Sequence, residues 1–181
     1  QTCALPIYTS VNIDPTAQEL AHIAIHAAKV ARYFKIEPKI AMLSYTDFTA
    51  KGTNPAKMRL AAELVKKEDP TLIVDGEIQA DTAINGAITE RVAPFSAIQG
   101  GANILIFPNL DAGNIGYKLV QQLGEAEVIG PFLMGVKKAA NVVQRTGNTE
   151  DAFNTAVMTA LECQALKEWA AGDVVTRDLT V

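Results

Sequence analysis

The chain has 181 residues, 49% of them hydrophobic and 20% charged, which is typical of a folded domain with a substantial core. Its 20 acidic residues outnumber its 16 basic ones, and because no long basic stripe is present, this balance argues against broad binding to nucleic acid or anionic membranes. Two cysteines cannot build a disulfide framework and no apolar run is long enough to cross a bilayer, so the sequence predicts a cytoplasmic protein.

The first seven residues, QTCALPI, look more like translated sequencing adapter than a protein start. We therefore expect residues 1–7 to be an artefactual extension and exclude them from the fold prediction. If this is correct, the natural N-terminus is missing and the chain is a fragment.

From residue 11 onward, short apolar runs alternate with segments of helical periodicity. The alternation predicts an α/β fold, in which a mainly parallel sheet is covered by helices on both faces. Strands or strand ends are expected at 11–14, 39–45, 71–77, 102–108 and 127–136, with a loop or further strand at 140–144. Helices are expected at 15–34, 55–69, 80–92, 114–124 and 149–169, the first opening at Pro15 and the third weakened by Gly86.

Ligands of such sheets bind beyond the carboxyl ends of the strands, where the turn PNLDAGN follows the strand expected at 102–108. Gly113 would let the backbone approach a ligand, Asn109 and Asn114 could donate hydrogen bonds, and the free N–H groups of a helix start favour an anion. Tyr117 and Lys118 add a hydroxyl and an ammonium, which suits a phosphate or an acyl phosphate. On spacing alone the alternative stays open that Asn114 caps the helix, Tyr117 packs and Lys118 is solvated.

Five segments occur in the order and spacing of the phosphate acetyl/butyryltransferase family: MLSY, LIVDGEIQAD, ANILIFPNLDAGNIGYKLVQ, VIGPFLMGV and QRT. The chain resembles the carboxyl-terminal half of these enzymes from residue 11 to about residue 165. The resemblance implies a three-layer α/β/α sandwich, similar to that of isocitrate and isopropylmalate dehydrogenases, and a cleft between two such domains. It also implies transfer of an acyl group between coenzyme A and phosphate, no protein-bound metal, and a homodimer or larger homo-oligomer.

The resemblance also implies the domain organisation. Residues 8–148 would form the acyl-CoA and acyl-phosphate domain. Residues 149–181 would form a C-terminal helix and tail that pack on the missing first domain.

By the same resemblance, Asn109, Asn114, Tyr117 and Lys118 would line the acyl-phosphate pocket, where preorganised donors stabilise the oxyanion of acyl transfer. Ser44 corresponds to a serine at the edge of the cleft, and the alternative is a loop serine that caps a turn.

Gly130 and Pro131, in the IGP motif, are further substrate-binding candidates. Arg145 corresponds to an arginine that would bind phosphate bidentately, the alternative being an exposed loop arginine. Asp151 corresponds to an aspartate near the coenzyme A thiol, and would act as base; the alternative is an acid that complements the dipole of the last helix. The catalytic candidates are therefore Asn114, Lys118, Arg145 and Asp151.

Two departures from the family pattern put this chain's own activity in question. Gln122 replaces an arginine of the family pattern, Gln144 replaces a serine, and Thr146 replaces a glycine. Gln122 and Gln144 are nevertheless substrate-binding candidates. Losing a charged phosphate ligand removes about 1.5–3 kcal/mol of hydrogen bonding. Two alternative functions stay open. One is a non-catalytic acetyl-CoA-sensing domain at the end of an NADP-dependent malic enzyme, which SYTDF and PAKMR resemble; the other is a dimerisation domain with a vestigial cleft.

Three other groups are interpreted as structural. His22 and His26 are four residues apart on one helix but lack a third metal ligand. Asp75 and Glu77 are expected to fix loops by accepting backbone hydrogen bonds rather than to bind a cation with Asp81. Cys163 is expected to be a buried, inert thiol.

Overall fold

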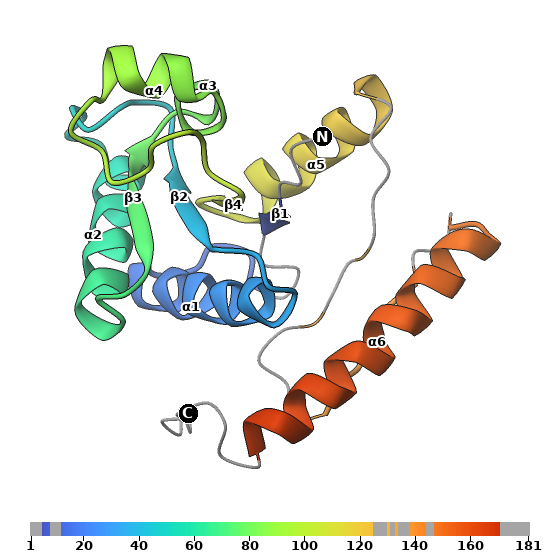
Figure 1. The fold of residues 1–181 in the computed structure, drawn as a ribbon. Helices are drawn as coiled ribbons and strands as arrows, with labels where there is room; N and C mark the ends of the chain where they lie inside the picture. Colours follow the sequence, from blue (N-terminus) through green and yellow to red (C-terminus); the bar gives the residue numbers. More distant parts are fainter. Residues whose placement is uncertain are drawn as a thin grey trace. The chain divides into compact units, whose positions relative to one another are not determined.

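The structure, a computed structural model, describes residues 5–7, 12–124, 130, 133, 138–143 and 147–170, without the side chains of 5–7 and 168–170 (Figure 1). The chain divides into a first unit, Gln1–Ala126, and a second unit, Glu127–Val181. No helix in these described ranges is both long and apolar enough to cross a membrane.

The first unit is built on a four-stranded sheet with the strand order β1-β4-β2-β3. Its strands are β1 (Leu5–Ile7), β2 (Lys39–Leu43), β3 (Ile73–Ile78) and β4 (Ile104–Ile106). Every neighbouring pair is parallel, which confirms the predicted sheet type. The strand end expected at 11–14 is wrong for the described residues 12–14, which lie outside the sheet, and the edge strand comes instead from the segment that the prediction excluded.

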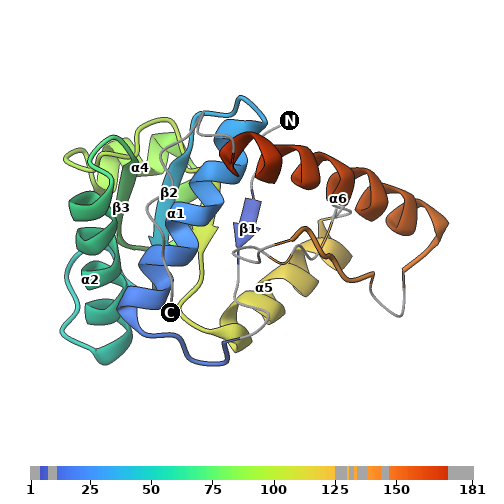
Figure 2. The same ribbon diagram turned by 90° about the horizontal axis from the view of Figure 1, so that it is seen from below.

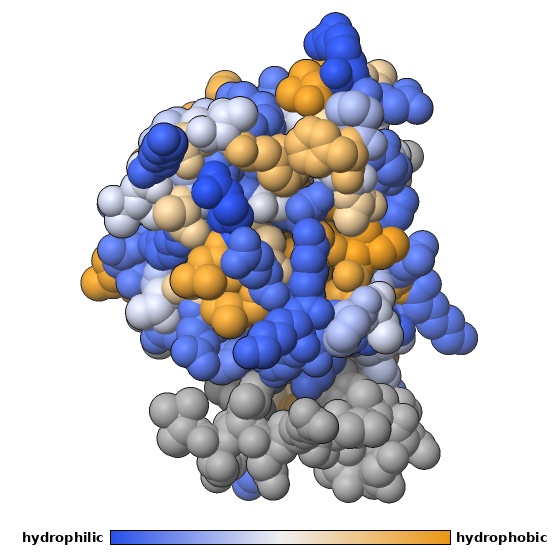
Figure 3. Space-filling view, turned by 90° about the vertical axis from the view of Figure 1, so that its left-hand side faces the viewer, coloured by the Kyte–Doolittle hydropathy of each residue, from blue (hydrophilic) through white to orange (hydrophobic). Residues whose placement is uncertain are grey.

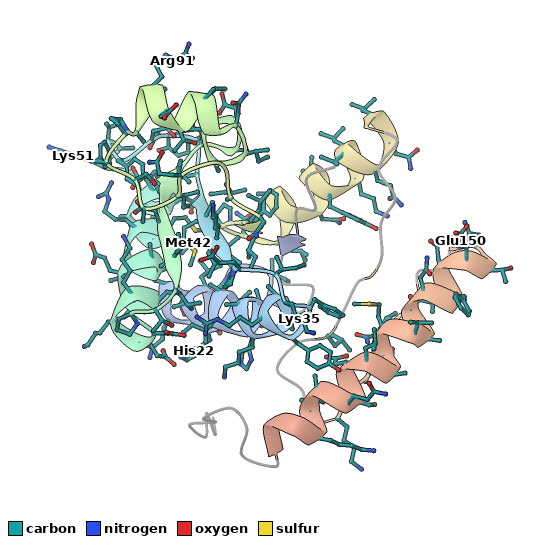
Figure 4. The ribbon with its side chains drawn as sticks, in the orientation of Figure 1. His22, Lys35, Met42, Lys51, Arg91 and Glu150 are labelled. Atoms are coloured by element: carbon teal, nitrogen blue, oxygen red, sulfur yellow. The ribbon has the colours of Figure 1, made fainter. Side chains whose placement is uncertain are left out.

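Helices α1 (Ala17–Tyr33) and α2 (Thr53–Glu68) lie side by side on one face of the sheet (Figure 2). The buried stripe of α1 is mostly alanine, and small side chains let a helix approach its neighbours closely. Met42 and Met58 are fully buried between these layers, and Figure 4 shows Met42 pointing into the interior while Lys51 and Arg91 project outward.

The other face of the sheet is covered by α3 (Ala80–Ile84), α4 (Gly86–Val92) and the chain that follows them. One continuous helix was expected over 80–92, but the chain breaks at Asn85, whose side-chain oxygen accepts hydrogen bonds from Ala87 N and Ile88 N and so starts α4. The apolar cluster on this face consists of Ala41, Leu43, Ile78, Ala83, Ile98, Ala102 and Leu105. The predicted three-layer arrangement is therefore present.

The molecular surface seen from the left of Figure 1, over α2, β3 and α4, is mainly hydrophilic, with hydrophobic residues in separate patches (Figure 3). Isolated apolar residues are normal on a protein surface. This face therefore does not present one extended apolar surface.

Two further helices complete the described chain. Helix α5 (Leu110–Leu123) follows β4 in the first unit. Helix α6 (Thr149–Ala170) makes up most of the described second unit, as expected for 149–169. Only residues 130 and 133 of the strand expected at 127–136 are described. Of the segment expected as a loop or further strand at 140–144, residues 140–143 are described and contain a single bridge residue, Asn141, but no strand, which agrees with the loop alternative.

Helix α1 ends in a turn that places a lysine in a conformation that favours glycine. Lys35 has φ 59°, and the N–H of Ile36 donates to Ala31 O at 2.9 Å, as in a Schellman motif. Lys35→Gly is therefore expected to stabilise the chain by about 1 kcal/mol, since glycine avoids the cost of the left-handed conformation. Urea unfolding of the chain measures the change. Lys29→Gly, inside the helix, should instead cost about 1 kcal/mol, and destabilisation by both variants would contradict the prediction.

Candidate functional site

The carboxyl ends of β2, β3 and β4 lie at the same edge of the sheet because the strands are parallel. Met42 is opposite Ile106 in the register, so Ser44 and Pro108 each lie two residues beyond paired positions of neighbouring strands. Helix α5 begins at this edge, directly after β4. The topology therefore brings the loop after β2 and the start of α5 to the place where parallel sheets bind ligands.

Helix α5 starts four residues earlier than the sequence predicts. Asn109 is its N-cap, and the side-chain oxygen of Asn109 accepts a hydrogen bond from Ala112 N at 2.9 Å. The helix expected from residue 114 was predicted too short, because the capping role belongs to Asn109 and not to Asn114. Asn114 thus lies one turn inside the helix, and Gly113 is buried within the first turn and a half.

Three of the predicted site residues line one open hollow. Asn114, Lys118 and Gln122 are four residues apart, so they lie on one face of α5. The hollow is shallow and wide open, because α5 alone lines it: its remaining lining consists of the exposed aliphatic side chains of Ile115, Leu119 and Leu123. A cation and two amides therefore lie next to a row of exposed aliphatic side chains, here called the apolar wall. The ammonium group can attract an anion, and the apolar wall can contact an apolar group beside it.

Tyr117 and Lys118 occupy different environments although they are adjacent. Tyr117 is buried, as the packing alternative proposed, and does not line the hollow. The ammonium nitrogen of Lys118 lies 4.9 Å from the centroid of the Tyr117 ring, within the range of a cation–π interaction. The Tyr117 ring therefore helps to fix the position of the Lys118 ammonium group.

Ser44 lies in the loop after β2, at the sheet edge. Its backbone N–H donates to Ile78 O at 2.9 Å, which ties the residue to β3. Its Oγ is buried and has no hydrogen-bond partner among the described residues. A buried hydroxyl in this state usually meets a water or a ligand.

Asp151 lies in the second unit, in the first turn of α6. Its carboxylate accepts a hydrogen bond from Asn148 N at 2.8 Å, and Asn148 Oδ1 accepts one from Asp151 N at 2.9 Å. This reciprocal pair is a capping box. The contacts of Asp151 are therefore those of an acidic residue at the start of a helix, which was the alternative to a catalytic base.

The remaining candidates belong to the second unit. Gly130 has φ 133°, a backbone conformation that side chains rarely adopt. Pro131, Gln144 and Arg145 lie outside the described residues. Cys163 is exposed, so the prediction of a buried thiol is wrong: the face of α6 on which it lies is not covered in the described chain.

The groups interpreted as structural make the contacts of structural residues. Ala97 N donates to Asp75 and Ala50 N donates to Glu77, which confirms that both carboxylates fix loops. His22 Nε2 lies 3.9 Å from a carboxylate oxygen of Glu68. Burial lowers the pKa of His26, and the nearby charge of Lys29 lowers it further. In the part of the chain that the structure describes, no three histidine, cysteine or acidic residues group together as a metal site would require.

The sequence analysis missed the apolar wall of the hollow. Ile115, Leu119 and Leu123 are 61%, 52% and 81% exposed, although all are large and hydrophobic. Their spacing of four residues follows that of the polar face, one position along. Two parallel repeats of four residues, one polar and one apolar, are the sequence signal that could have identified this wall. Apolar residues at helical spacing, however, more often indicate a buried core.

The comparisons with known proteins agree with one another. The family model described as "Phosphate acetyl/butaryl transferase" matches residues 8–160. A phosphate acetyltransferase of Bacillus subtilis is 44% identical over 154 residues, which cover 84% of this chain and 48% of that relative.

Solved structures show the same similarity. A phosphotransacetylase from Streptococcus pyogenes superposes with a TM-score of 0.80 at 44% identity, covering 87% of this chain and 48% of that one. A branched-chain phosphotransacylase from Enterococcus faecalis superposes with a TM-score of 0.68 at 29% identity, covering 84% of this chain and 57% of that one. The chain thus spans about half the length of the three relatives named here.

Proposed function

The chain belongs to the phosphate acetyl/butaryl transferase family, and on that premise we propose that the hollow on α5 is part of a site for an acyl-CoA and phosphate. The reaction would be transfer of the acyl group between coenzyme A and phosphate. The observation that carries the proposal is the grouping of Asn114, Lys118 and Gln122 in one hollow. The aliphatic wall beside them suits the acyl group or another apolar part of the ligand.

The proposed chemistry begins with attack of the coenzyme A thiolate on the acyl carbonyl of an acyl phosphate. The new carbon–sulfur bond forms, the carbon–oxygen bond to phosphate breaks, and phosphate leaves with the bonding electron pair. Lys118 would offset the charge of the phosphate, and the Asn114 amide would donate to the carbonyl oxygen as negative charge develops there. Both groups would stabilise the transition state more than the ground state.

The remaining family roles are part of the same proposal. Asp151 would accept the thiol proton, a role in which it would also keep its cap to Asn148. Arg145 and Gln144 would contact the phosphate, with Gly130 and Pro131 beside the substrate, while Ser44 and Asn109 would lie at the sheet edge. A homo-oligomer, packing of 149–181 on a first domain, and the artefactual nature of 1–7 also stay predictions. The relatives named above are acyltransferases and lend no support to the malic-enzyme alternative.

The proposal is tested with the full-length protein that contains this chain. Acetyl-CoA is incubated with phosphate, or with arsenate in its place, and the free thiol is measured with a colorimetric reagent. Thiol release that requires the anion is the expected result. If no thiol is released with either anion, while the folded protein still binds acetyl-CoA in a titration, the site binds without catalysis and the proposed reaction is wrong.

Restoring the family arginine should strengthen anion binding. In Gln122→Arg a guanidinium would enter the hollow beside Lys118, adding a charge-assisted hydrogen bond of about 1.5–3 kcal/mol. We expect acetyl phosphate to bind this chain about tenfold or more tightly, as measured by calorimetric titration. Gln121→Arg adds the same charge one residue earlier in the helix, outside the hollow, and should change the Kd much less. Equal effects of the two variants would refute the assignment of Gln122 to the site.

A further inference from the structure

The 44–50 loop, which follows β2, is fastened to the end of β3 along most of its length. Ser44 N donates to Ile78 O at 2.9 Å, and Phe48 N donates to Glu77 O at 3.0 Å. The Asp47 carboxylate accepts from Gln79 N at 2.8 Å and from Gln79 Nε2 at 2.6 Å. A surface loop is usually the most mobile part of a fold, so this many attachments indicate that its conformation matters.

A buried carboxylate lies at the centre of these attachments. Glu77 is fully buried, and its Oε1 accepts hydrogen bonds from Thr46 Oγ1 at 3.0 Å and from Ala50 N at 3.1 Å. Its Oε2 accepts from Arg59 Nη2, on α2, at 2.5 Å. The same nitrogen of Arg59 donates to Ala50 O at 3.0 Å. The pair therefore holds both the N–H and the carbonyl group of Ala50.

One residue of the loop, Phe48, also has an unfavourable backbone conformation. Phe48 has φ 58°, which is uncommon for a bulky residue, and its ring packs edge-to-face on Phe95 with centroids 5.0 Å apart. Such a conformation persists only where the surroundings determine it. Burying the Glu77 carboxylate is costly as well, although the Arg59 side chain that pairs with it is 39% exposed. The contribution of Glu77 and Arg59 is therefore more readily explained by a specific loop conformation than by stability alone.

The fixed conformation of the loop also sets the position of Ser44. It is the first residue of the loop, it lies at the sheet edge where α5 begins, and its buried Oγ lacks a hydrogen-bond partner among the described residues. We propose that Glu77 and Arg59 are a positioning pair, which holds the 44–50 loop so that the Ser44 hydroxyl meets the phosphate or acyl oxygen of the ligand. The proposal rests on the proposed function, because that function supplies the ligand.

The same strand and helix provide a matched control. Asp75 of β3 is also buried and contacts Lys66 of α2, with a distance of 3.1 Å between Lys66 Nζ and Asp75 Oδ1. Its other oxygen accepts from Ser96 Oγ and Ala97 N, both at 2.9 Å. This second pair therefore fixes a different loop, and Asp75→Asn removes a comparable charge without touching the 44–50 loop.

The test compares Glu77→Gln and Asp75→Asn in the full-length protein. Glu77→Gln should raise the KM for acetyl phosphate tenfold or more and speed the amide exchange of Phe48 and Ala50 at least tenfold. Asp75→Asn should leave both quantities within about twofold, even if the two variants lose similar thermal stability. If Glu77→Gln does not fold, Arg59→Gln should give the same rise in KM, with Arg59→Lys restoring part of the loss.

A double-mutant cycle shows whether the pair acts through Ser44. Ser44→Ala should itself raise the KM, and adding Glu77→Gln to it should then have little further effect, because the positioned group is already absent. Additive effects, or an unchanged KM in Glu77→Gln despite faster amide exchange, would overturn the proposal while the proposed reaction stands. A wild-type protein that neither binds nor turns over acetyl phosphate would instead refute the function and with it the ligand of Ser44.

Discussion

Gly76→Ala is expected to destabilise the first unit by about 3 kcal/mol or more. Gly76 lies in β3 with φ 144°, and a Cβ atom there would meet Met42 O at 2.6 Å and Met42 Cβ at 2.7 Å. Neither atom can move away, because Met42 belongs to the neighbouring strand β2 and is fully buried. Urea unfolding followed by circular dichroism measures the loss.

Gly100→Ala separates the contribution of the backbone conformation from that of the close contact. Gly100 has φ 75°, but the nearest atom that its Cβ would meet is Lys39 Nζ at 3.8 Å, an ordinary contact. This variant should therefore cost only the conformational strain, about 1–2 kcal/mol. If Gly76→Ala were no more destabilised than Gly100→Ala, the close packing of β3 on Met42 would be wrong.

Lys118→Met is expected to weaken the binding of acetyl phosphate to this chain by about tenfold to a hundredfold. The substitution keeps the apolar stem of the side chain and removes the ammonium group from the hollow. The loss corresponds to one charge-assisted hydrogen bond of about 1.5–3 kcal/mol. Calorimetric titration at low ionic strength measures the Kd, since screening by salt would reduce the difference.

The control for this variant is Lys67→Met, an exposed lysine in the last turn of α2. It removes the same charge from the first unit but lies outside the hollow. Because a general loss of positive charge affects both variants alike, only the difference between them reports the site. A Kd that rises by the same factor in both variants, or that rises in neither, would show that Lys118 does not contact the anion.

Local sequence patterns predicted the fold to a large extent. The apolar runs over β2, β3 and β4 and the helical periodicity of α1, α2 and α6 depend on neighbouring residues, so they can be recognised without the tertiary structure. The break at Asn85 and the start of α5 at Asn109 were missed, although both are capping residues. Each is an asparagine that could equally lie inside a helix, and the choice depends on the hydrogen bonds available to the following N–H groups.

The candidate site was predictable only where its residues are close in sequence. Asn114, Lys118 and Gln122 share a helix, and the spacing of four residues is enough to place them together once the helix is known. Their functional meaning came from a family resemblance, not from spacing. The exposure of Cys163 and the burial of Tyr117 depend on what packs over each helix, which no local pattern contains.

By itself, then, the sequence determined the alternation of β2, β3 and β4 with helices and their parallel sheet, because alternating strands and helices leave few other arrangements. It did not determine the edge strand β1, which lies in the segment that the prediction excluded. Only the tertiary structure decided that Glu77, Arg59 and Ala50 meet around one buried carboxylate, and that the Ser44 hydroxyl is buried without a partner among the described residues. The physical reason is that a hydrogen bond between residues far apart in the chain depends on how strands and helices pack, and packing is a property of the whole fold.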